Sequence, residues 1–184
     1  MAKQFAAIDE NRSAFISRQK IFFAGSAANG SRVNISPRST EHLHVIGPNE
    51  VAYLDLTGSG SETAAHARAG GTMTIMLCAF DGPPLILRLY GKAEIAFRGS
   101  PAYQTFLDRH YPDGEPLGAR QVVTLTVDLV QTSCGYAVPL FDHAGERPIL
   151  DRWAAAKGED GLRAYRQEKN VESIDGLPTG FVEA

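Results

Sequence analysis

Residues 28–38 read Ala-Asn-Gly-Ser-Arg-Val-Asn-Ile-Ser-Pro-Arg, and this stretch decides the fold class. The dipeptide Asn29-Gly30 favours the positive φ angles that a tight hairpin turn requires. An apolar run, Ile21–Ala24, comes before the turn, and an alternating stretch, Arg32–Ser36, follows it. Two strand patterns joined by such a turn form an antiparallel pair, so the sequence predicts a β-hairpin at this point.

The second strand of this hairpin has two different faces. Polar and apolar residues alternate along it, which is the period-two pattern of a half-buried strand. We expect Val33 and Ile35 to point into the core, and we expect Pro37 to end the strand. The opposite face then carries Arg32, Asn34 and Ser36.

Strand patterns also dominate the chain beyond this hairpin. They cover residues 42–46, 51–56, 72–80, 85–97 and 121–130. Gly91, within one of them, predicts a bend or bulge. Short helices are expected at Asp9–Arg18, 64–68 and Pro101–His110. Because the β-α-β alternation of a parallel sheet is absent, we predict a mainly β, α+β fold built on an antiparallel barrel with short peripheral helices.

The C-terminal part of the chain differs in character from the rest. Pro148–Lys157 and Glu159–Lys169 are charged and helical, and Gly158 separates them. Residues 170–184 have little periodicity, so we expect an extended arm there. The length of 184 residues fits a single domain. We expect a barrel at about residues 10–140 and a C-terminal helical extension with its arm at about residues 147–184.

Composition and charge argue against several classes of function. The net charge is −3 and the basic residues are scattered, whereas a nucleic-acid-binding face needs a basic stripe. No apolar run reaches the length of a membrane span. The first ten residues lack the apolar core of a secretory signal. We therefore expect a cytoplasmic protein that binds neither nucleic acid nor a membrane.

The loop Thr57–Thr63 is rich in glycine and hydroxyl groups and leads into the helix predicted at 64–68. Such a loop binds phosphate when its backbone N–H groups point outward and its hydroxyls add hydrogen bonds. The simpler interpretation is a helix cap, because Ser59 and Glu62 have the Ser-x-x-Glu spacing of a capping box. Both interpretations are compatible, because a capped helix still leaves other N–H groups free.

The polar face of the strand Arg32–Ser36 is a second candidate ligand site. Its side chains are of the kind that hydrogen-bond a planar polar ligand or a phosphate, and Arg38 adds a positive charge just beyond Pro37. A plain solvated strand face is the alternative for any one of these residues.

Cysteine and histidine residues give no metal motif. Cys78 lies in an apolar run and is expected to be a buried thiol, and a disulfide with Cys134 is not expected in a reducing compartment. Cys134 and Tyr136, at the end of the strand 121–130, are candidates for the substrate side of a site. A Cys134 nucleophile would need a partner such as His110 or His143 in space. We predict no metal site.

The order of these segments resembles a known family, the pyridoxamine 5'-phosphate oxidase-like, FMN-binding split barrels. The resemblance covers about residues 5–140 and is carried by the segments together rather than by any one of them. They are Gln19–Phe23, Gly30–Arg38, Val51–Thr57 with the Gly/Ser loop to His66, Thr72–Leu77 and Leu89–Ala93. It implies an antiparallel split β-barrel that forms a homodimer, with one FMN in each of two clefts between the subunits.

The resemblance also implies a set of cofactor-binding residues. The strand Arg32–Ser36 would line the flavin ring and the ribityl chain, and Thr57 matches a threonine on the flavin side. The full set is Arg32, Val33, Asn34, Ile35, Ser36, Arg38, Thr57, Ser59, Ser61, Glu62, Thr63 and Arg88.

One departure from the family pattern lies at the phosphate. Where the true oxidase has Ser-Arg-Lys, this chain has Ser61-Glu62-Thr63, so two cations are missing. Arg32, Arg38 or Arg88 would have to supply the positive charge.

The departure, together with the absence of an Arg-x-His ending, argues against vitamin B6 oxidase activity. The expected function is a flavin-dependent oxidoreductase of a small-molecule substrate. Two alternatives stay open: a deazaflavin-dependent reductase on the same fold, and a non-catalytic module that binds flavin or haem. A haem module would need His42, His44 or His66 as an axial ligand.

Overall fold

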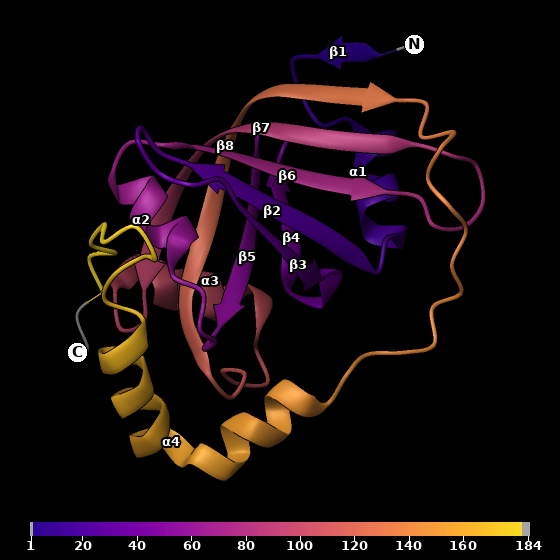
Figure 1. Ribbon diagram of the computed structural model, residues 1–184. Helices are drawn as coiled ribbons and strands as arrows, with labels where there is room; N and C mark the ends of the chain where they lie inside the picture. The colour runs from indigo at the N-terminus through magenta and orange to yellow at the C-terminus, as the bar shows by residue number, and fades with distance from the viewer. Residues whose placement is uncertain (1, 182–184) are drawn as a thin grey trace.

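The computed structural model describes residues 2–181, and its centre is one antiparallel sheet that curls into a split barrel (Figure 1). The strands are β1 Lys3–Phe5, β2 Ile21–Ala27, β3 Asn34–Ser39, β4 Leu43–Gly47, β5 Glu50–Leu56, β6 Thr72–Cys78, β7 Ile86–Phe97 and β8 Ala119–Ser133. Their order across the sheet is β3-β2-β6-β7-β8-β5-β4, and β1 pairs with β8. The predicted fold class, an antiparallel split barrel with peripheral helices, is confirmed.

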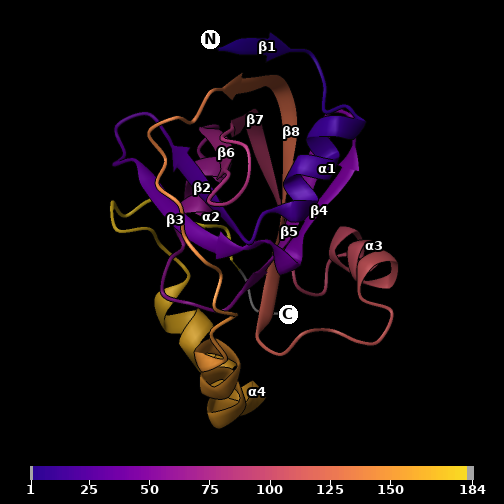
Figure 2. The same ribbon diagram turned by 90° about the vertical axis from the view of Figure 1, so that its right-hand side faces the viewer.

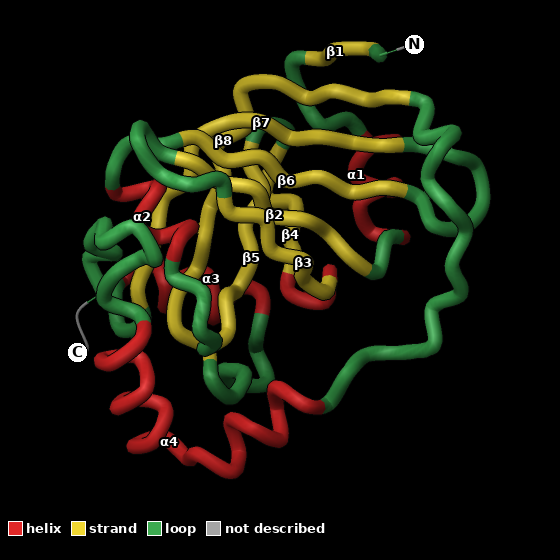
Figure 3. Tube along the Cα trace, in the orientation of Figure 1, coloured by secondary structure: helices red, strands yellow, loops and turns green. Residues whose placement is uncertain are grey.

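The helices lie around this sheet (Figure 3). They are α1 Glu10–Arg18, α2 Glu62–Arg68, α3 Pro101–His110 and α4 Ile149–Lys169, with a short 3₁₀ helix, η1, at Thr40–His42. Asp9 caps α1 by accepting the backbone N–H of Arg12 at 2.9 Å, as its position before the helix predicts. Within α4, Gly158 has φ 64° and ψ 174°, which confirms the predicted break between two helical segments.

The barrel interior holds the main core, and α1 packs at its edge. Phe15 and Ile16 of α1 join buried side chains from β2, β5, β6, β7 and β8, such as Phe22 and Leu125. A second, smaller core lies between α3 and the β5–β8 pair, where Tyr103 packs against Leu54 and its neighbours (Figure 2). Because both faces are covered there, residues 51–55 of β5 and 119–123 of β8 are buried.

The long strands β7 and β8 are bent at Gly91. Their register shifts between Tyr90 and Gly91, with Asp128 as the extra residue of β8. A side chain has no space at Gly91, because a Cβ atom there would lie 1.8 Å from the carbonyl oxygen of Thr126. The predicted bulge is confirmed, and close backbone approach is its cause.

The strand β3 corrects two predictions. Val33, just before it, and Ile35 within it are 71% and 66% exposed, so they do not face the core. Ser36 and Arg38 pair with Ala24 and Phe22 of β2 and share their inward face. Pro37 does not end β3, which runs to Ser39. An edge strand tolerates proline because its missing N–H is not needed by a second neighbour.

The C-terminal part crosses from one end of the barrel to the other. After β8 an extended segment runs along the outside to α4, and the chain then returns toward α2 (Figures 1 and 3). This returning segment, residues 170–181, is called the C-terminal arm below; residues 182–184 of the predicted arm lie outside the described residues. Within residues 2–181, no helix is both long enough and apolar enough to cross a bilayer.

Candidate functional site

A buried charge cluster lies at the end of β5. Asp55, which is 1% exposed, accepts hydrogen bonds from Arg38 of β3, from Arg120 at 2.9 and 3.0 Å, and from Gln121 at 2.7 Å. Burial alone would raise the pKa of Asp55, but the charges of Arg120 and Arg38 together with these hydrogen bonds hold it below its ordinary value. The cluster therefore joins β3, β5 and β8 through one ionised carboxylate.

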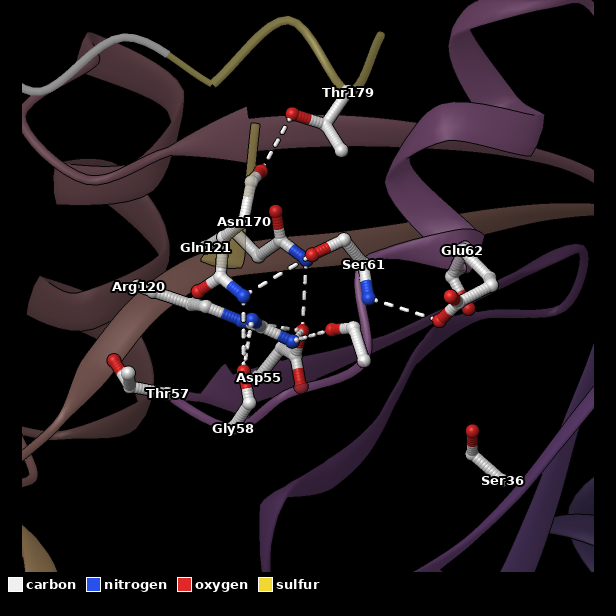
Figure 4. Close-up of polar contacts among 12 residues, drawn as sticks. Ser36, Asp55, Thr57, Gly58, Ser61, Glu62, Arg120, Gln121, Asn170 and Thr179 are labelled. Atoms are coloured by element: carbon white, nitrogen blue, oxygen red, sulfur yellow. Dashed lines mark hydrogen bonds and ion pairs between the residues drawn. The ribbon is translucent and has the colours of Figure 1, made fainter. Parts of the chain in front are cut away.

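The same cluster fixes the loop between β5 and α2 (Figure 4). The guanidinium of Arg120 donates to the carbonyl oxygens of Gly58 at 3.1 Å and Gly60 at 2.6 Å. The side-chain amide of Asn170, from the C-terminal arm, donates to the same Gly58 oxygen at 2.9 Å. Because two elements distant in sequence hold its carbonyl groups, the loop is anchored in one conformation.

A polar crevice separates this loop from β3. It is lined by Asn34, Ser36, Arg38, Gly60, Ser61, Glu62, Thr63, Ala64 and Gln121. Asn34 and Ser36 contact each other through their side chains, with 3.3 Å between Nδ2 and Oγ. The family resemblance implies one ligand site that includes both the polar strand face and the loop, and in the structure the two line the same crevice.

A larger cavity of about 400 Å³ begins where this crevice ends, and Arg38 lines both. Its lining is mixed: Phe22, Tyr53, Leu54 and Leu56 supply apolar and aromatic surface, and Glu41 and His42 supply polar groups. Burial raises the pKa of Tyr53 to about 12, so its hydroxyl stays protonated. Residues 146–148, 150 and 151, at the start of α4, close the other side.

A second cavity of about 590 Å³ adjoins the first. The two share Pro37, Arg38, Ser39, Glu146 and Arg147. Because Arg38 lines all three, the crevice and the two cavities adjoin one another along β3, and together they are called the groove below.

Arg38 is the central residue of this groove. Its guanidinium pairs with Asp55 and lies 5.0 Å from the centre of the Tyr53 ring. Burial would lower the pKa of Arg38, but the Asp55 carboxylate raises it above its ordinary value. Among the described residues, 2–181, the buried Nε atom of Arg38 has no hydrogen-bond partner. A buried donor of this kind fits a ligand that brings an acceptor.

The predicted capping box at Ser59 is wrong. The helix α2 begins at Glu62, and Ser61 is its N-cap residue. The Glu62 carboxylate accepts the backbone N–H of Ser61 at 2.9 Å. The hydroxyl of Ser61 instead donates to the carbonyl oxygen of Lys169 at 3.2 Å. Glu62 therefore does bond the N–H of the capping residue, but that residue is Ser61, because the arm packs against the loop at this point.

The C-terminal arm covers the outer side of the same loop. Asp175 accepts the backbone N–H of Arg32 at 2.7 Å and also pairs with the Arg32 guanidinium. The N–H of Ile174 points at the Glu62 carboxylate, 3.4 Å away. The hydroxyl of Thr179 closes the arm by donating to the carbonyl oxygen of Asn170 at 2.7 Å. The contacts of Asp175 with Arg32 and of Ile174 with Glu62 join residues more than a hundred positions apart, so the sequence contains no local signal for them.

Several predicted site residues lie away from the groove. The Thr57 hydroxyl is buried and donates to the carbonyl oxygen of Gly118 at 2.7 Å. Arg88, on β7, lies opposite Met76 of β6 in the sheet. Its guanidinium donates to the hydroxyl of Ser133 at 3.2 Å, at the opposite end of the barrel from α2. Cys134 is exposed, and Tyr136 is 82% exposed; neither lines the cavities described above.

Histidines form a cluster of their own between β4 and α3. The hydroxyl of Tyr111 lies 2.9 Å from Nδ1 of His42 and 3.3 Å from Nε2 of His44. The His44 and His110 rings stack with 4.3 Å between their centres. Burial, followed by the charges of His110 and His42, lowers the pKa of His44 to about 4. The cluster is therefore neutral at neutral pH and joins α3 to the sheet.

His66 is enclosed rather than open to a ligand. It is 1% exposed, and its Nδ1 lies 2.9 Å from the hydroxyl of Ser26. An axial haem bond from this imidazole would require α2 to move. Among residues 2–181, no three His, Cys, Asp or Glu side chains are arranged to hold a metal ion.

Sequence reasoning missed Asp55, Arg120, Gln121 and the contacts of the arm. Asp55 had a weak signal, because it is the single charged residue inside the apolar strand pattern Val51–Leu56. Such a residue is buried only when it is paired. Nothing near Asn170 or Asp175 in the sequence marks them as partners of the loop.

Comparison with known proteins identifies the family. The profile of the Pyridoxamine 5'-phosphate oxidase family matches residues 8–134. A curated relative, the Pyridoxamine 5'-phosphate oxidase family protein ustO of Aspergillus flavus, is 34% identical over 190 residues, covering 95% of this chain and 76% of the relative. This chain therefore belongs to the pyridoxamine 5'-phosphate oxidase family, as its sequence resemblance predicts.

Solved structures agree on the fold. HupZ of Group A Streptococcus aligns with a TM-score of 0.53 and 17% identity, over 66% of this chain and 91% of that chain. A protein related to general stress protein 26, of the pyridoxinephosphate oxidase family from Clostridium acetobutylicum, aligns with a TM-score of 0.50 and 15% identity, over 67% of this chain and 86% of that chain. At these identities the likeness shows the split-barrel fold and nothing finer.

Proposed function

We propose that this chain binds FMN in the groove along β3 and acts as a flavin-dependent oxidoreductase on a small-molecule substrate. One observation carries the proposal: a polar strand face adjoins a cavity whose lining includes apolar and aromatic side chains, and the buried Nε of Arg38, which lines both, lacks a partner among residues 2–181. A ligand with a planar ring and a hydroxylated chain fits both parts. Family membership supports a flavin as that ligand.

In this proposal, different residues of the chain bind different parts of the flavin. Asn34 and Ser36 offer an amide and a hydroxyl to the ribityl chain and the ring edge. Arg38 offers its free Nε–H to a ring carbonyl and holds a positive charge beside it. Phe22 and Tyr53 supply apolar and aromatic surface and exclude water.

The chemistry belongs to the cofactor. When bound, FMN supplies reversible electron and hydride transfer. The protein positions the ring and keeps Arg38 protonated next to it, since its partner Asp55 raises the pKa of the guanidinium. A fixed positive charge at that place favours the more electron-rich form of any ligand that it touches. We therefore propose that Arg38 favours electron acceptance by the bound cofactor.

We further propose that the protein is a homodimer with the cofactor at the subunit interface. Val33 and Ile35 form an exposed apolar patch on the edge strand, a feature typical of an interface. Cys134 and Tyr136 are exposed in one protomer, so we propose that they reach the substrate side of the cleft from the partner subunit. The two free cysteines are compatible with the cytoplasmic location that we propose.

The test is the absorbance spectrum of the purified protein, followed by mass spectrometry of the material released by heat. FMN at about one per chain is expected. If no chromophore is present and added FMN is not taken up, the flavin proposal is wrong. A released deazaflavin or a Soret band would instead support one of the two alternative functions.

A pair of variants locates the site. Ser36→Ala should weaken FMN binding several-fold, on the order of one lost hydrogen bond. Ser17→Ala is the matched control, because that hydroxyl lies on α1 and donates within its own helix, to the carbonyl oxygen of Ala14 at 3.0 Å. Equal affinities of the two variants would place the flavin elsewhere.

A further inference from the structure

The end of the groove next to α2 already contains a carboxylate of this chain, that of Glu62. Glu62 lines the polar crevice, and its two carboxylate oxygens face the N–H groups of Ser61 at 2.9 Å and of Ile174 at 3.4 Å. Backbone N–H groups at such a place are the donors that a bound anion would use. Glu62 therefore occupies donors that a ligand phosphate would otherwise take.

The nearby cations are also engaged. Asp175 binds both the backbone N–H and the guanidinium of Arg32. This backbone hydrogen bond, followed by the Arg32 side chain, lowers the pKa of Asp175, so it is ionised at neutral pH. Arg38 and Arg120 share the carboxylate of Asp55. None of these arginines can approach a phosphate near Ser61 without leaving a carboxylate of the chain.

The charges that line the crevice cancel. Arg38 contributes one positive charge and Glu62 one negative charge, and the other lining residues are neutral. Behind the crevice, Asp55 likewise stands against Arg120. The helix that begins here, α2, has only 7 residues, and the Glu62 carboxylate already accepts the N–H of its capping residue, Ser61. A phosphate dianion placed at this end would meet no net attraction.

We propose that Glu62 is a specificity-determining residue: the site holds a flavin by its ring and ribityl chain and gains little from a terminal phosphate, so that riboflavin binds as tightly as FMN. This inference rests on the proposed flavin-binding function. Asp175 has a secondary part in it, because it neutralises Arg32, the cation closest in sequence to the polar strand face.

The experiment compares FMN with riboflavin as probes of the full-length protein, by flavin fluorescence titration at low salt. For the unaltered protein the two dissociation constants should agree within about threefold, against a tenfold preference expected for even one uncompensated cation. Glu62→Gln keeps an acceptor for the N–H of Ser61 and removes the charge. It should tighten FMN about tenfold and leave riboflavin unchanged, because a phosphate dianion near one carboxylate loses about that factor in a water-like dielectric.

Two further variants keep the test decisive. Asp175→Asn frees the charge of Arg32 and should also shift the preference toward FMN, so the inference does not depend on whether Glu62→Gln folds. Glu168→Gln, an exposed carboxylate beside Lys169, is the matched control and should change neither constant. Thermal melting of each variant checks that it is folded.

The outcomes separate this inference from the proposed function. Tenfold or tighter binding of FMN than of riboflavin by the unaltered protein would overturn the inference and leave the flavin function intact. The same holds if neither Glu62→Gln nor Asp175→Asn changes the ratio while both fold. Failure of every form to bind either flavin would overturn both. Equal binding that turns into an FMN preference in the two variants would establish the role of Glu62.

Discussion

Asp55→Asn is the substitution that most directly tests the physical account of the site. The change keeps the shape of the side chain and removes its charge. Asp55 is 1% exposed and compensates the guanidinium groups of Arg38 and Arg120 at once. The variant therefore leaves two positive charges in a buried place without a carboxylate, and one amide oxygen cannot accept all of the former hydrogen bonds.

The expected cost follows from these contacts. Breaking a buried ion pair by removing one partner costs about 3–5 kcal/mol. A domain of this size has a free energy of unfolding of about 5–15 kcal/mol, so the loss is a large fraction of the total. The loop Gly58–Gly60 should loosen as well, because Arg120 holds its carbonyl groups.

The assay is urea unfolding followed by far-UV circular dichroism, with Asp113→Asn, an exposed loop residue, as the control. The pH dependence of this loss in stability provides a second test, because its direction can be predicted. The pKa of Asp55 is lowered in the folded protein, so its stabilisation is complete above the ordinary value of 3.8 and is lost as the pH falls through the lowered value. The difference between wild type and variant should therefore shrink in acid. A loss below about 1 kcal/mol at neutral pH would refute the reasoning.

Three further predictions concern other parts of the fold. Gly91→Ala should lower the free energy of unfolding by about 3 kcal/mol or more in urea unfolding, because its Cβ would lie 1.8 Å from the carbonyl oxygen of Thr126; a smaller loss contradicts the close approach. The pKa of His44 is lowered to about 4, so the folded protein should gain stability as the pH rises from about 4 to 6.5. His44→Phe should reduce the slope of the thermal unfolding midpoint plotted against pH in this range. An unchanged slope argues against the histidine cluster. Val33→Asp with Ile35→Asp should convert the proposed dimer to monomers in light scattering, and a dimer that persists rules out this edge as the interface.

The strand pattern of the sequence predicted most of the fold. Alternation and turn residues act over a few neighbours, so they locate Ile21–Ala24, 51–56 and 121–130 within strands almost residue by residue. Pro101–His110 was predicted with the bounds that the structure has, since a proline at the first turn is a local signal. The glycine at position 91 predicted the bulge that the structure has at this point of β7.

The face of β3 could not be predicted from its alternation. Periodicity divides a strand into two faces but does not say which one is buried. Val33 and Ile35 carry the apolar side chains, yet the pairing with β2 turns Ser36 and Arg38 inward. Polar residues are tolerated there because the buried Asp55 accepts the charge of Arg38.

By itself the sequence determined the elements, the fold class and the family, because each depends on local patterns or on their order along the chain. Only the tertiary structure decided the site. Arg120 and Asn170 converge on one loop from two distant segments, and the C-terminal arm brings Asp175 to Arg32 across 143 positions. Contacts of this range have no local signature, because burial and pairing in space select them.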